Sequence, residues 1–73
     1  MSMRAEVYST ILETLRKMGG KALEQNLLDE LRARGLELLP EILRQALLKL
    51  EMHEKVRVIS LDTERKLIEL VEA

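Results

Sequence analysis

The chain contains no cysteine, which excludes disulfide bonds, zinc fingers of the cysteine type and thiol chemistry. Small secreted domains usually depend on disulfides, so their absence favours a cytoplasmic protein. Aromatic residues are almost missing, with Tyr8 the only one. Because a core needs bulky apolar side chains, this core must consist mainly of leucine, isoleucine, valine and methionine.

Long apolar runs and an excess of charge are also missing. No run approaches the ~20 residues of a membrane span, and the first residues lead into a charged amphipathic pattern unlike a signal peptide. The 12 basic and 13 acidic residues leave a net charge of -1. Dedicated nucleic-acid binders usually carry an excess of basic residues. In this chain a nucleic-acid-binding surface would therefore have to come from local clustering of basic residues. Frequent leucine, arginine and glutamate are typical of proteins from thermophiles.

Three amphipathic helices account for the first two thirds of the chain, whose 73 residues suffice for one domain. Apolar spacings of three and four predict a helix near 8–18, which Gly19 and Gly20 end. A second helix is expected from about Leu23 to Gly35, and a third from Pro40 to about residues 52–54. The segment 21–23 is interpreted either as the start of the second helix or as a short extended piece before it.

The apolar period changes after residue 54. Residues 56–61 are rich in β-branched side chains and predict a strand, 66–71 predict its partner, and 62–65 the connecting turn. Both strands carry apolar residues on both faces, which leaves their register open. A single helix over 65–73 is the competing interpretation. The predicted core is Tyr8, Ile11, Leu12, Leu15, Leu27, Leu31, Leu43, Leu47, Leu50, Val56 and Val58.

Three helices followed by a hairpin resemble the winged helix-turn-helix family. The most specific match is the segment 43–51, LRQALLKLE, followed shortly by Val56. In that family an Ala-Leu pair and then a Leu-Glu pair lead from the third helix into the first wing strand. The resemblance covers nearly the whole chain and is nearest to short stand-alone versions common in archaea. It implies one domain over 1–73, mainly α, with three helices and a C-terminal two-stranded wing. One departure is the turn His53-Glu54-Lys55, where the family often has a glycine.

The resemblance also implies a DNA-binding surface, because in the family the third helix enters the major groove and the wing contacts the backbone or the minor groove. By position, the outward residues of this helix are Glu41, Arg44, Gln45, Leu48 and Lys49. Arginine and glutamine can contact guanine and adenine in a bidentate manner, and lysine and arginine contact phosphates. We therefore expect a small DNA-binding protein, a transcriptional regulator, that contacts double-stranded DNA through Arg44, Gln45, Lys49, Lys55, Arg65 and Lys66.

An adaptor module that binds a protein and no nucleic acid is the alternative interpretation. Three acids on or just after the third helix, Glu41, Glu51 and Glu54, would repel a phosphate backbone. Leu48 points toward the expected groove side of the helix. Flanked by Ile42 and Met52, it would form an apolar strip suited to a protein partner.

Patterns for catalysis are missing too. His53 is the only histidine and has no second metal ligand in recognisable spacing, and its expected place is a solvated helix end. The Gly19-Gly20-Lys21 segment lacks the remainder of a phosphate-binding loop. The sequence therefore predicts neither an enzyme nor a metal or cofactor site. A homodimer is expected, because helix-turn-helix regulators often bind two half-sites, and its contact would use the first helix or residues 70–73.

Overall fold

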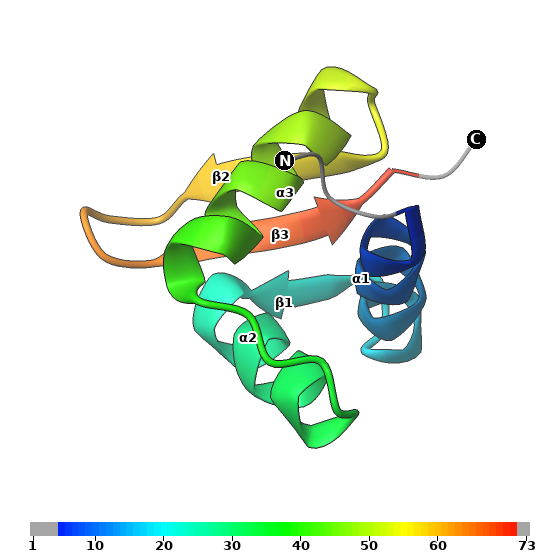
Figure 1. The fold of residues 1–73 in the computed structure, drawn as a ribbon. Coiled ribbons are helices and arrows are strands. Elements are labelled where there is room, and N and C mark those ends of the chain that lie inside the picture. Colours follow the sequence, from blue (N-terminus) through cyan, green and yellow to red (C-terminus); the bar gives the residue numbers. More distant parts are fainter. Residues whose placement is uncertain (1–4, 72–73) are drawn as a thin grey trace.

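Three helices and a small sheet make up the computed structural model, which describes residues 5–71 (Figure 1). The elements are α1 (Ala5–Lys17), β1 (Lys21–Leu23), α2 (Glu24–Ala33), α3 (Pro40–Met52), β2 (Val56–Ser60) and β3 (Lys66–Leu70). In the view of Figure 1, α3 lies across the front of the sheet. The three predicted helices and the hairpin are confirmed. The competing helix over 65–73 is wrong, because β3 occupies residues 66–70.

The sheet has three antiparallel strands in the order β1-β3-β2. The prediction of a two-stranded wing therefore lacked one strand, and of the two interpretations of residues 21–23 the extended one is right. The physical reason is the central position of β3, which offers hydrogen-bonding groups on both of its edges. Ala22 of β1 lies opposite the fully buried Ile68, so the third strand also closes one side of the core.

The register explains why both hairpin strands carry apolar residues on both faces. Ile68 lies opposite Val58 on one side and Ala22 on the other, and this row belongs to the core beneath the helices. Because side chains alternate along a strand, the next row lies on the other face of the sheet. That row is also apolar and half-buried, and consists of Leu23, Ile59 and Leu67.

The core joins α1, α2, α3 and the sheet. Its buried apolar residues are Ile11, Leu15, Ala22, Leu27, Leu28, Leu31, Leu43, Ala46, Leu47, Leu50, Val56 and Ile68. Every predicted core residue is buried except Tyr8, Leu12 and Val58, which are half-buried and pack against the edge of this cluster. Tyr8 and Leu12 lie on the flank of α1 that borders a surface groove, which is why they keep part of their surface in water.

The end of α3 shows how the turn closes without a glycine. The backbone N–H of Lys55 donates to the carbonyl oxygen of Leu50 at 2.8 Å, the long bond of a Schellman motif. This motif needs a left-handed residue just before the donor, and Glu54 takes that conformation with φ 59°. Gly19 and Gly35 occupy the same place after α1 and α2. The departure from the family pattern is therefore accommodated by a strained glutamate.

Candidate nucleic-acid interface

The outward face of α3 is exposed to solvent. All five residues that the sequence placed outward are exposed, namely Glu41, Arg44, Gln45, Leu48 and Lys49. Because an α-helix turns by about 100° per residue, they do not share one line. Gln45 and Leu48 lie near the middle of the face, whereas Arg44 and Lys49 lie on opposite flanks, about 140° apart.

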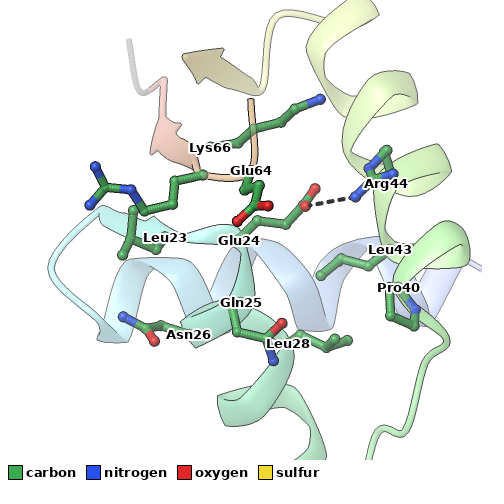
Figure 2. A pocket seen from close by; sticks show the side chains of 11 residues that line it. Leu23, Glu24, Gln25, Asn26, Leu28, Pro40, Leu43, Arg44, Glu64 and Lys66 are labelled. Carbon is green, nitrogen blue, oxygen red and sulfur yellow. Dashed lines mark hydrogen bonds and ion pairs between the residues drawn. The ribbon is translucent and has the colours of Figure 1, made fainter. Parts of the chain in front are cut away.

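One group of predicted DNA contacts gathers on the wing side of α3. Arg44 of α3, Arg65 of the wing turn and Lys66 of β3 line one hollow of about 380 Å³ (Figure 2). The start of α2 forms its floor. The remaining lining residues are Leu23, Glu24, Gln25, Asn26, Leu28, Pro40, Leu43 and Glu64. The fold thus brings cations from α3 and the wing to one site, although some twenty residues separate them in the chain.

Arg44 is held by the carboxylate of Glu24, which is not among the site residues predicted from the sequence. Its Nη2 lies 3.3 Å from Oε1 of Glu24, the first residue of α2. The arginine side chain is 59% exposed, whereas that of Glu24 is only 17% exposed. A guanidinium has five N–H donors, so this contact leaves most of the Arg44 donors available. The two residues are 20 positions apart, and no helical or strand spacing relates them.

Arg65 is fixed within the wing turn. Its Nε donates to Oδ2 of Asp62 at 2.8 Å, and Oδ1 of Asp62 accepts the backbone N–H groups of Arg65 at 2.7 Å and Glu64 at 2.9 Å. The Arg65 side chain, followed by these backbone N–H groups, holds the pKa of Asp62 below its ordinary value. The aspartate thus orders the turn and neutralises Arg65. Lys66, in contrast, forms no ion pair within residues 5–71.

The other predicted cations lie elsewhere. Lys49 and Lys55 border a mostly apolar groove of about 350 Å³ between α1 and the C-terminal end of α3, together with Tyr8 and His53. Gln45 lines neither hollow. The six predicted contacts therefore form no single patch. His53 is the exposed C-cap residue of α3, which confirms its expected place at a solvated helix end.

The apolar strip of the protein-partner interpretation is shorter than predicted. Leu48 is 57% exposed and Met52 74%, and they lie one turn apart on the outward face. Ile42 is half-buried and lies about 120° away from Leu48 around the helix axis. The exposed strip therefore consists of Leu48 and Met52 alone.

One predicted source of repulsion, Glu51, is bound to the sheet on the wing-side flank of α3, where it lines a hollow with Arg44 and Lys66. Oε2 of Glu51 accepts the backbone N–H of Val58 at 3.2 Å, and Glu51 is half-buried between α3 and β2. Glu41 and Glu54 remain exposed. Within residues 5–71 no group of three or more potential ligands could hold a metal ion, and no helix there is long and apolar enough to span a bilayer.

A helix-turn-helix formed by α2 and α3, followed by an antiparallel hairpin whose turn lies beside α3, defines a winged-helix fold. A solved structure shares it: F93 from STIV, described as a winged-helix DNA-binding protein, aligns with a TM-score of 0.77 and 22% sequence identity over 99% of this chain and 77% of that one. No protein-family model matches the chain, and no curated protein matches it either. At this identity the likeness establishes the winged-helix fold.

Proposed function

We propose that this chain binds double-stranded DNA through α3 and the wing turn, as a transcriptional regulator. One observation carries the proposal: Arg44 of α3 and Lys66 of the wing line the same exposed hollow. A recognition helix in the major groove places side chains such as Arg44 at base edges, while a wing lysine lies beside the backbone. The description of F93 as a DNA-binding protein supports the same ligand.

The charge balance of the chain predicts a modest affinity for DNA. The chain has a net charge of -1, so it lacks a general attraction to phosphate. On the wing side, Arg44 and Arg65 are paired with carboxylates, and Lys66 is the cation there without an ion pair among the described residues. Few phosphates would be neutralised by one copy, and we therefore expect a shallow dependence of affinity on salt.

Fluorescence anisotropy with labelled random and selected duplexes, at low and moderate salt, tests the proposal. Arg44→Ala should cost ~1–3 kcal/mol on the preferred sequence, whereas Lys66→Ala should weaken binding to all sequences alike. Lys17→Ala is the matched control, since Lys17 pairs with Glu13 on α1, outside the proposed interface. If no duplex binds at low salt and high micromolar protein, the proposal is wrong.

A protein partner is the second candidate, favoured by the exposed pair Leu48 and Met52 on the outward face of α3. In that case Leu48→Ala should weaken the complex and Arg44→Ala should leave it intact. DNA binding predicts the opposite order of effects. Comparing these two variants in the same binding assay therefore distinguishes the candidates.

A further inference from the structure

Glu24, an acidic residue in the first turn of α2, lies at the junction of α2, α3 and the wing turn. Its side chain borders two hollows, one between α2, α3 and the wing turn and another of about 280 Å³ between α3 and the sheet. Arg44 and Lys66 line both hollows as well. Figure 2 shows the Glu24 carboxylate extended toward Arg44, with Lys66 and Glu64 above it.

The contact restricts an otherwise free side chain. Arg44 is mostly exposed, and a solvated arginine samples many rotamers whose loss costs free energy on binding. A partner that is largely shielded from water, as Glu24 is, keeps the guanidinium on the wing-side flank of α3. One donor is used, and further N–H groups remain for a bidentate contact with a base.

We propose that Glu24 is a positioning residue, which fixes the direction in which Arg44 approaches a base edge and thereby sets sequence discrimination. This inference rests on the proposed DNA binding. The same carboxylate has an opposite effect on general affinity, because a negative charge beside the interface repels phosphates. Glu24 thus lowers the affinity for DNA of any sequence and raises the selectivity at the base pair that Arg44 contacts.

Replacing Glu24 by the isosteric glutamine separates these two effects. Glu24→Gln should bind random duplex about two- to fivefold more tightly, because one repelling charge is gone. Its preference for the selected sequence over a variant at the Arg44 base pair should fall about tenfold, the discrimination that one oriented bidentate contact provides. Anisotropy titrations with both duplexes measure the two quantities side by side.

Glu64→Gln is the matched control. Glu64 lines the same hollow and is exposed, but it forms no hydrogen bond or ion pair with Arg44. Its replacement removes the same charge from the same surface, so random-duplex affinity should rise while the preference stays as in the parent chain. Thermal unfolding of each variant shows that the fold is intact.

A double-mutant cycle with Arg44→Ala completes the test. Without Arg44, Glu24→Gln should cause no further loss of preference, because Glu24 acts through that side chain. Equal preferences in Glu24→Gln and Glu64→Gln, or a loss that persists without Arg44, would overturn the role of Glu24 and leave DNA binding standing. If the parent chain binds no duplex, both proposals are overturned together.

Discussion

Leu47 and Leu48 are neighbours in α3 with opposite surroundings. Leu47 is 1% exposed and Leu48 57% exposed. Leu47→Ala should lower the free energy of unfolding by ~2–5 kcal/mol, because a cavity replaces buried methyl groups. Leu48→Ala makes the same chemical change on the surface and should be nearly neutral. Chemical denaturation measures both, and an unmoved midpoint for Leu47→Ala would contradict the packing of α3.

Asp62 provides a second test at the residue scale. Its pKa is lowered mainly by the Arg65 side chain and then by the backbone N–H groups of Glu64 and Arg65. A carboxyl group whose pKa is lowered on folding stabilises the fold at pH values above its ordinary pKa of 3.8. This stabilisation is lost as the pH falls through the lower pKa of the folded state. In an NMR titration, Asp62 should titrate below 3.8, and Arg65→Ala should raise its pKa. An unchanged pKa in Arg65→Ala would disprove the assigned cause.

The sequence predicted some residues of the site and not others, for a physical reason. Arg44 follows from its residue type and from the phase of α3, since the buried set of that helix defines the outward side. Glu24 carries no such signal, because it meets Arg44 only through the packing of α2 against α3 and the wing. Ile42 lies outside the exposed strip because it is half-buried and about 120° from Leu48 around the helix axis, whereas the predicted strip rested on residue type alone.

At the scale of the element, the end of α3 offers a stabilising substitution. Glu54 has a left-handed backbone, with φ 59°, which costs a residue with a Cβ atom roughly 1–2 kcal/mol. Glu54→Gly should therefore raise the free energy of unfolding by about 1 kcal/mol. Glu54→Ala removes the same carboxylate but keeps the Cβ atom, so it should bring no such gain. Calorimetry that gives both variants the same midpoint would contradict this account of the turn.

The strand β1 could not be predicted from the local sequence pattern alone. A three-residue strand is too short to display alternation, and its partner β3 lies more than forty positions later. The preceding glycines and the apolar Ala22 and Leu23 suited a helix start as well as an extended piece. In β2 and β3, by contrast, the apolar runs were long enough to predict a hairpin, and β2 is rich in β-branched residues. The order of the strands in the sheet followed only from the fold.

At the scale of the molecule, self-association is expected from size. A domain of 73 residues leaves much apolar surface in water, and a two-fold dimer would present two α3 helices to two half-sites. The groove bordered by Tyr8, Leu12 and Leu50 lies on α1, the helix that the sequence assigned to this contact. Of the other assigned surface, residues 70–73, the last two lie outside the described residues.

Light scattering checks this prediction. The dimer should give about twice the chain mass of 8.4 kDa, and Ser9→Arg, at an exposed position in the groove, should return it to a monomer whose circular dichroism still shows the native fold. A parent chain that stays at 8.4 kDa at high concentration would contradict the dimer. A dimer that Ser9→Arg leaves intact would place the contact elsewhere.

The most direct test of the account is a map of the DNA contact on the protein. In a titration of isotope-labelled protein with duplex DNA, followed by NMR at low salt, the amide signals of α3 from residues 41–49 and of the wing from 62–66 should shift. The signals of the remote flank of α1 should stay in place in the same titration. Shifts confined to α1, or none at high micromolar DNA, would contradict the central claim that α3 and the wing form the DNA-binding surface.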